Sequence, residues 1–243
     1  MPASLARAFL SLVVPPLCVA CREPELSGAA VCPPCAAQMI AITSCCVRCA
    51  APLPCSAPAC SECRGRDLAF ERAWAPFTYT GPAREVVLGL KGRGLTAAAR
   101  YMAEAIAGRA QPALPAGILV PAPAHPERMR RHGTNQARAL AEALGRVTGS
   151  QVRDVLARRP GGARQVGLER HARGANARGS IRVRARLAES PPVVLVDDVY
   201  TTGSTLDACA LALKGSGSGP VIAVCFARTV LAPGPVAQRP AGA

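Results

Sequence analysis

Aromatic residues are scarce in this 243-residue chain, and long apolar runs are missing. Aromatic side chains make up 3% of the residues while half of the chain is hydrophobic, so alanine, valine and leucine must form the core. Charged residues make up 18%, and no segment approaches the roughly 18 consecutive apolar residues that indicate a membrane-spanning helix. Intrinsic disorder is excluded as well, because disordered chains are too poor in apolar residues to bury a core. The composition predicts a soluble globular protein without a membrane span.

Lysine is almost absent. Only Lys91 and Lys214 are lysines among 29 basic residues, which face 15 acidic residues and give a formal net charge of +14. The other basic residues are arginines, and alanine, glycine and proline are abundant too, as a genome-wide compositional bias would produce. Because such a bias adds arginine without selecting any acidic partner, the net charge alone is weak support for nucleic-acid binding.

The chain also lacks a recognisable secretion signal. Residues 8–17 have the apolar length of a signal core, but Pro15 and Pro16 end it and no small-residue cleavage site follows. A lipoprotein signal at Cys18 fails too, because these prolines occupy positions that require small residues. We therefore expect a cytoplasmic protein whose cysteines stay reduced or bind metal.

Cysteine, by contrast, is concentrated at one end of the chain. Ten of the twelve cysteines lie in residues 1–63, and eight of them form CxxC pairs. The pairs are Cys18/Cys21, Cys32/Cys35, Cys46/Cys49 and Cys60/Cys63. Each pair places two sulfurs on one tight turn, and two turns complete a tetrahedral four-thiolate zinc site. Equal gaps within residues 21–32 and 49–60 suggest two successive ribbon-like modules, each closed and structural because no ligand position remains open.

Buried reduced cysteines or scattered disulfides are the alternative interpretation, which the four pairs disfavour. Spacing does not decide whether the pairs combine in sequence order or cross over. Cys45 and Cys55 are expected to be spare, although Cys45 could replace Cys46 in a shifted pairing.

Apolar runs alternate with helix-like stretches after the cysteine cluster. Strands are predicted over residues 73–80, 117–120, 192–196 and 221–226, and helices over residues 82–90, 95–109, 134–148 and 204–214. Strands that alternate with helices indicate an α/β fold, in which a parallel sheet is covered on both faces.

Residues 193–206 (VVLVDDVYTTGSTL) are the most informative segment. An apolar strand brings Asp197 and Asp198 to its carboxyl end, where open α/β sheets bind ligands. A loop with Gly203 follows, and its N–H groups and hydroxyls suit a phosphate monoester at the start of the next helix. The hydroxyls belong to Thr201, Thr202, Ser204 and Thr205. Carboxylates beside a phosphate site suit a ribose diol or Mg²⁺.

The alternative is an ordinary capped helix after a strand, with acidic residues in its loop. A nucleotide triphosphatase is disfavoured because the chain lacks a GxxxxGK motif.

This segment resembles the PRPP-binding signature of type I phosphoribosyltransferases. With the cysteine cluster in front, the chain resembles the ComF family of competence-associated proteins, which join an amino-terminal zinc module to a phosphoribosyltransferase-like domain. Matching stretches are LGLKGRG at 88–94, VPAPAHPERMRRHGTNQA at 120–137, and Arg158, Arg159, Gln165, Leu168, Glu169, Arg170 and Asn176. The resemblance covers residues 16–229, and one departure is Thr134, where the family usually has an aromatic residue.

The resemblance implies a type I phosphoribosyltransferase-like sheet with helices on both faces. We expect a zinc-binding module of the double zinc ribbon type over residues 1–66, the phosphoribosyltransferase-like domain over residues 67–230, and a disordered tail over residues 231–243. It also implies two structural Zn²⁺ ions, Mg²⁺ with PRPP, and protein partners in the competence machinery.

Site roles follow from the same resemblance. Asp197 and Asp198 would hold the ribose hydroxyls directly or through Mg²⁺, and residues 201–205 would hold the 5′-phosphate. The loop after residue 120 resembles the pyrophosphate loop, and residues 158–173 resemble the mobile flap. The cations assigned to the diphosphate or flap are Arg128, Arg131, Arg158 and Lys91, the last as the weakest assignment. No histidine stands out as a general base: His125, His132 and His171 are expected to be surface or loop residues.

Residues 121–186 are strongly basic and could attract a DNA backbone. They contain fifteen arginines and four acidic residues. No aromatic residue occurs over residues 102–199, so this region cannot stack bases as single-strand binders commonly do. Contact with single-stranded DNA should therefore be electrostatic, independent of sequence and sensitive to salt. The alternative is that some of these arginines serve the diphosphate while the rest are solvated.

Three functions remain open. The first is a PRPP-binding, ComF-like protein in DNA uptake or processing, with or without turnover. The second is a true phosphoribosyltransferase that acts on an unidentified base or amine. The third is a zinc-dependent adaptor for single-stranded DNA with a vestigial sugar-phosphate site.

Overall fold

Most of the chain is described by a computed structural model. The described residues are 16–53, 60–90, 95–110, 114–159, 179–187 and 190–230, and only the backbone is described at Leu95, Arg128, Arg131 and His132. The predicted tail at 231–243, Lys91, Cys55 and nearly all of the predicted flap lie outside these residues.

A five-stranded parallel sheet forms the centre of the fold. Strand β7 (Val221–Arg228) pairs with β6 (Val193–Tyr200), which pairs in turn with β3 (Ile118–Pro121). On its other side, β7 pairs with both β1 (Ala73–Trp74) and β2 (Phe77–Thr78). The predicted strand over residues 73–80 is thus split in two, because Pro76 has no backbone N–H to donate between the two halves.

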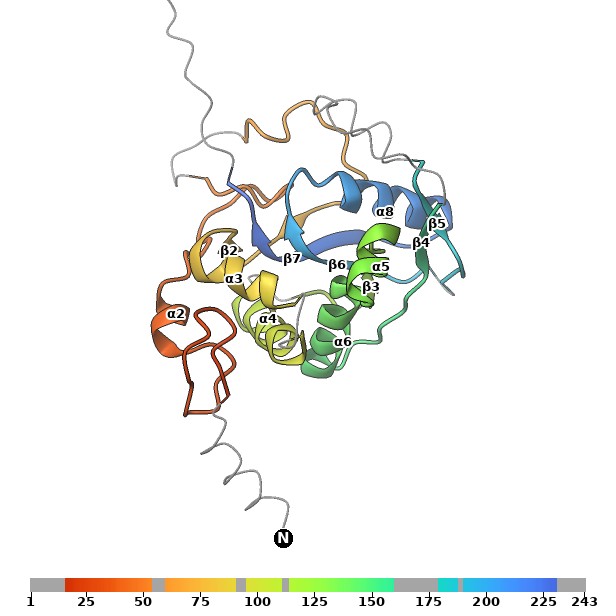
Figure 1. Ribbon diagram of the computed structural model, residues 1–243. Helices are drawn as coiled ribbons and strands as arrows, with labels where there is room; N and C mark the ends of the chain where they lie inside the picture. Colours follow the sequence, from red (N-terminus) through yellow and green to blue (C-terminus); the bar gives the residue numbers. More distant parts are fainter. Residues whose placement is uncertain are drawn as a thin grey trace, which may run out of the picture.

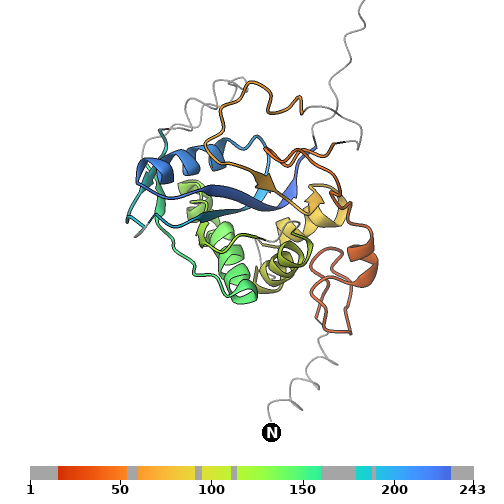
Figure 2. The ribbon, with the colours of Figure 1, turned by 180° about the vertical axis from the view of Figure 1, so that it is seen from behind.

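Helices cover both faces of this sheet, as the alternating pattern predicts (Figure 1). Helices α3 (Gly81–Gly89), α4 (Leu95–Arg109) and α6 (Gln136–Thr148) lie on one face, and α8 (Ser204–Gly215) lies on the other. Figure 2 shows the same layers from behind. Successive strand residues point to opposite faces, so Val193 and Leu195 enter the core under α8 while Val194 and Val196 enter the core under α4 and α6. Burial on both faces explains the apolar runs of residues 193–196 in β6 and 221–227 in β7.

Three short elements that follow the cysteine-rich segment were not predicted from the sequence. A short helix, α5 (Pro126–His132), occupies part of the expected pyrophosphate loop, with Pro126 at its start, a position that proline tolerates well. An antiparallel pair, β4 (Leu156–Arg158) with β5 (Ile181–Val183), stands apart from the main sheet, and β5 packs against α8. Three-residue strands carry too short an alternation to be recognised in a sequence.

The cysteine-rich segment packs against the sheet instead of forming a separate core. Cys18 and Cys35, at the end of the chain that contains α2 (Pro33–Ala37), join the core under α4, while Cys49 and Cys60 join the core under α8. Residues 40–42 run along β2, where Thr78 N donates to Ile40 O at 3.0 Å and Ile42 N donates to Pro76 O at 2.8 Å. This contact covers the outer edge of the sheet, which would otherwise expose unpaired backbone groups. Among the described residues, no helix is long and apolar enough to cross a membrane.

Close backbone approach at Gly117 gives a test of the β3–β6 contact. A Cβ atom at this position would lie 2.7 Å from the carbonyl oxygen of Pro192. We expect Gly117→Ala to reduce the free energy of unfolding by about 1–3 kcal/mol, because backbone cannot yield as a flexible side chain would. Urea unfolding measures the change. Gly108→Ala in α4 is the control: that site is open, so it should be neutral or stabilising, and an equal loss in both variants would contradict the argument.

Candidate functional site

A pocket of 270 Å³ lies at the carboxyl ends of β3 and β6. Its walls come from the segment after β3, from the second half of β6, from the starts of α6 and α8, and from β4. The carboxyl ends of neighbouring parallel strands are the usual ligand site of open α/β sheets. The volume is close to the lower limit of about 300 Å³ for small-molecule pockets, which suits a small polar ligand.

Asp197 and Asp198 both line this pocket. The sequence placed them just after a strand that ends at residue 196, but the ladder with β7 continues to Tyr200, so both lie inside β6. Asp197 Oδ1 accepts the N–H of Asp198 at 2.9 Å, and Asp198 Oδ1 accepts the N–H of Val199 at 2.8 Å. These bonds fix each carboxylate against its own strand and leave both side chains at the pocket wall.

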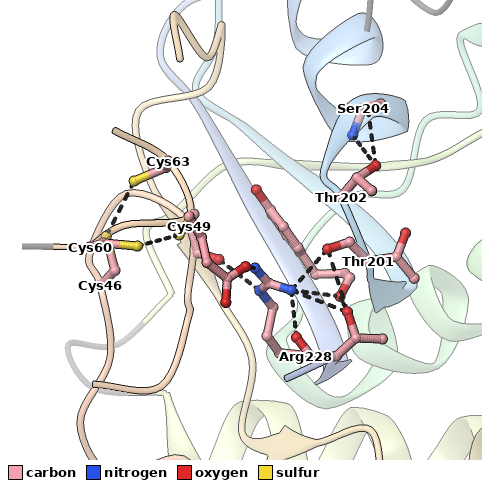
Figure 3. Close-up of polar contacts among 11 residues, drawn as sticks. Cys46, Cys49, Cys60, Cys63, Thr201, Thr202, Ser204 and Arg228 are labelled. Carbon is pink, nitrogen blue, oxygen red and sulfur yellow. Dashed lines mark hydrogen bonds and ion pairs between the residues drawn. The ribbon is translucent and has the colours of Figure 1, made fainter. Parts of the chain in front are cut away.

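The loop of residues 201–205 also contributes to the pocket wall. Thr201 and Thr205 line the pocket, whereas the hydroxyls of Thr202 and Ser204 pair with each other at 3.0 Å (Figure 3). Gly203 caps α8 with φ +76°, and any Cβ there would collide with the ring of Tyr200. Glycine is therefore required both by backbone conformation and by space. The first turn of α8 supplies backbone N–H groups that have no partner within the helix.

Arg158 connects this loop to the segment after β3. Its Nε donates to Pro123 O at 3.2 Å, and its Nη2 donates to Thr205 Oγ1 at 3.5 Å. Among the described residues of the pocket wall, Arg158 is the one lysine or arginine. Arg128 and Arg131 lie on α5, with side chains outside the described part, and Lys91 lies outside it altogether.

Sequence reasoning assigned no role to several polar residues of the wall. Asn135 caps α6, and its Nδ2 donates to Ala122 O at 3.0 Å, which fixes the loop after β3. Gln136 is buried, and its amide nitrogen has no hydrogen-bond partner among the described residues. His125 caps α5 by accepting the N–H of Glu127. Asn135 and Gln136 lie in the stretch of residues 120–137 that resembles the ComF family, and this resemblance was the signal that could have identified them.

A larger groove of 820 Å³ adjoins the pocket and shares Arg158 with it. Arg130, Arg138 and Arg184 also line the groove. Two of these cations are paired: Arg184 lies 3.1 Å from Asp154, and Arg138 lies 2.8 Å from Glu142. The groove is thus less positive than its arginine content suggests.

The eight CxxC cysteines form two groups in sequence order, which settles the pairing that spacing left open. The sulfurs of Cys18, Cys21, Cys32 and Cys35 lie within 4.8 Å of one another, and so do those of Cys46, Cys49, Cys60 and Cys63. We call these the first and the second four-cysteine group. Sulfur–sulfur distances of 3.8, 3.6 and 3.4 Å fit a zinc site, since Zn–S bonds of about 2.3 Å put tetrahedral sulfurs about 3.8 Å apart. The two groups are consistent with two structural zinc ions, and Cys45 belongs to neither.

Thiol ionisation differs within each group. Burial opposes ionisation of Cys18, but backbone N–H donors led by Cys32 overcome it and lower the pKa of this thiol to about 6. Burial and the hydrogen bond with Cys46 raise the pKa of Cys63 to about 11. Burial likewise raises the pKa of Cys35 and Cys49. Four thiolates at this separation need a cation between them, and Zn²⁺ meets that need.

Comparison with known proteins finds a distant relative along nearly the whole chain. The chain is 29% identical over 227 residues to the DNA utilization protein YhgH of Salmonella typhi, a match that spans 90% of this chain and 100% of that protein. No protein-family model matches the chain. The similarity to YhgH and the two four-cysteine groups confirm the resemblance to the ComF family.

Metal analysis of single cysteine variants tests the two groups. We expect about two zinc ions per purified chain, and about one after Cys46→Ser, because three thiolates no longer close the second group. Mass spectrometry of the metal content gives the ratio. Cys45, the neighbour of Cys46, is the matched control, since Cys45→Ser should keep both ions. A wild-type ratio near zero, or an equal loss of zinc in both variants, would refute the assignment.

Proposed function

We propose that this chain binds PRPP or a similar phosphosugar together with Mg²⁺, and that it acts in DNA uptake or processing. The observation that carries the proposal is one pocket, at the carboxyl ends of β3 and β6, that is lined by Asp197 and Asp198 together with Thr201 and Thr205. Carboxylates suit a ribose diol or a hard cation, and a hydroxyl-lined helix start suits a phosphate.

The charges of the pocket fit Mg²⁺. Its described wall contains two carboxylates and the single guanidinium of Arg158. A diphosphate would add further negative charge, so the ligand needs a cation that also accepts carboxylate oxygens. Mg²⁺ is bound in this way, through one or two carboxylates and the substrate's phosphates.

Each wall then has a role in binding. Asp197 and Asp198 hold the ribose hydroxyls, directly or through the metal ion, and Thr201, Thr205 and the first N–H groups of α8 hold the 5′-phosphate. Arg158 donates to Pro123 O in the loop after β3, which resembles the pyrophosphate loop, and contributes positive charge near the diphosphate. Arg128, Arg131 and Lys91 remain predicted diphosphate ligands, and Thr202, Gly203 and Ser204 shape the loop.

Catalytic turnover is the first alternative. In a phosphoribosyltransferase the bond between the sugar carbon and the diphosphate loosens toward an oxocarbenium-like state, and positive charge stabilises the departing diphosphate. In this alternative Arg158 would supply that charge. Release of pyrophosphate with a nucleobase or amine would support turnover, and absence of release across such acceptors would leave a binding protein.

The four-cysteine groups serve as structural zinc sites in this proposal. Four thiolates fill the coordination sphere of each ion, so no position remains for water or substrate. The first group contributes to the core on one face of the sheet and the second group to the core on the other face. Loss of zinc should therefore disturb the fold around the pocket as well as the cysteine turns.

DNA contact rests on the relative and on the groove. YhgH is described as a DNA utilization protein, and exposed arginines such as Arg130 line the groove beside the pocket. The alternative of a zinc-dependent DNA adaptor with a vestigial sugar-phosphate site predicts DNA binding without any response to PRPP.

Thermal unfolding with ligand tests the phosphosugar site. We expect PRPP with Mg²⁺ to raise the melting temperature, since a ligand at one hundred times its Kd stabilises the native state by about 2.7 kcal/mol. Asp197→Asn combined with Asp198→Asn should abolish the rise. The control is Glu104→Gln, an exposed carboxylate on α4 that pairs with Arg100 away from the pocket. An unchanged rise in the double variant would contradict the site assignment.

Salt dependence tests DNA binding. We expect the affinity for single-stranded DNA to fall linearly with the logarithm of salt concentration, with a slope of about −0.7 per phosphate contacted. Fluorescence anisotropy measures it. Arg130→Ala in the groove should reduce the slope, whereas Arg100→Ala on α4 should leave it unchanged. Absence of binding at low salt would end the DNA hypothesis.

A further inference from the structure

Arg228 is a buried cation at the end of the apolar strand β7. It is 1% exposed and is the last residue of β7, after seven apolar residues. A buried charge is costly unless its hydrogen bonds are satisfied, so its partners show what it stabilises.

One edge of the guanidinium binds the second four-cysteine group. Nε donates to Cys49 O at 3.1 Å, and Nη2 donates to the Glu62 carboxylate at 2.6 Å. Glu62 lies between Cys60 and Cys63, so Arg228 contacts both CxxC turns of this group. Figure 3 shows the guanidinium between these cysteines and Thr201.

The other edge binds backbone at the start of the loop of residues 201–205, which is proposed to hold the 5′-phosphate and which we call the phosphate loop. Nη1 donates to Thr201 O at 2.9 Å and to Thr229 O at 2.7 Å. The guanidinium also stacks on the ring of Tyr200, 4.3 Å from its centroid. That ring lies directly against Gly203, so Arg228 supports the loop through the ring of Tyr200 as well as through the hydrogen bond at Thr201.

The hydroxyl of Tyr200 does not help to hold the ring in place. It is buried and has no hydrogen-bond partner in the described part of the chain. Burial raises the pKa of Tyr200 well above its usual range, so the ring stays neutral under the loop. The position of the ring depends on packing with Phe70 and on the guanidinium above it.

We infer that Arg228 is a positioning residue that couples the second four-cysteine group to the phosphate loop, so that zinc in this group and phosphosugar in the pocket strengthen each other's binding. This inference rests on the proposed function. If the CxxC turns lose their zinc and move, the partners of Arg228 at Cys49 and Glu62 move with them. The buried charge must then find other acceptors, and Thr201 loses a fixed donor. Coupling of two binding equilibria is reciprocal, so ligand in the pocket must retain zinc in the second group to the same degree.

The first four-cysteine group supplies an internal control. It lies in the core on the other face of the sheet, and no hydrogen bond among the described residues joins it to residues 201–205. Its zinc should respond to neither Arg228 nor the ligand.

The test measures zinc release to a chromophoric chelator from the full chain, with and without PRPP and Mg²⁺. Cys46→Ser, which removes the second group, identifies the release phase of each ion. In the wild type we expect the ligand to slow the second-group phase by about tenfold and to leave the first-group phase unchanged. Release from the first group also serves as a correction for any zinc that the diphosphate itself binds.

Arg228→Lys keeps the charge but cannot span both edges with a planar guanidinium. We expect it to speed release from the second group alone and to weaken PRPP binding about tenfold. Glu62→Gln changes a partly exposed partner and should act in the same direction, so the inference remains testable if Arg228→Lys does not fold. Arg84→Lys, at an exposed pair with Glu85, should change neither quantity.

Two failures are distinguishable. If the wild type binds PRPP but both variants release zinc and bind PRPP as it does, the coupling is refuted while the proposed function stands. If the wild type shows no PRPP binding, the proposed function falls and the ligand half of the coupling falls with it. A variant that speeds both zinc phases equally would show general destabilisation and would also overturn the inference.

Discussion

Parallel pairing of β6 with β7 is the constraint on which the rest of the structure depends. It aligns the carboxyl ends of two long strands: β6 contains Asp197 and Asp198 in its second half and leads into residues 201–205, and β7 ends in Arg228. Because both faces of these strands are buried, a shift of register would move charged residues into a core. The pairing therefore fixes the acid pair and the buried guanidinium at one edge of the sheet.

Charged residues at this edge of the sheet have two different sets of contacts. The pocket gathers two carboxylates and keeps one described guanidinium, so that it suits a metal ion with a phosphorylated sugar. Arg228 pairs with Tyr200 in the β6–β7 ladder, and its guanidinium binds backbone carbonyls and Glu62 instead of lining the pocket. The same edge thus holds Arg158 at the pocket and Arg228 between the cysteine-rich segment and the sheet.

Much of the fold was predictable because its signals are local. The apolar runs of β6 and β7 and the periodic helices α4 and α6 appear near their predicted positions, and the parallel sheet with helices on both faces is confirmed. The helix α5 and the β4–β5 pair were missed, because such short elements depend on tertiary contacts more than on their own pattern. The strand was also ended too early at residue 196, since acidic residues are rare in buried strands and only the ladder to β7 accounts for them there.

Local sequence patterns were enough to identify the chemistry of the sites: CxxC turns that suit zinc, and an acid pair followed by a hydroxyl-rich loop, each formed by residues close together in the chain. The folded chain was needed to show how the cysteine pairs combine, which hydroxyls reach the pocket, and that Arg228 contacts Glu62 and Cys49. The two contacts of Arg228 join residues 179 and 166 positions apart in the chain. Such contacts leave no local pattern in the sequence, and the acceptor at Cys49 is a backbone carbonyl, which every residue has.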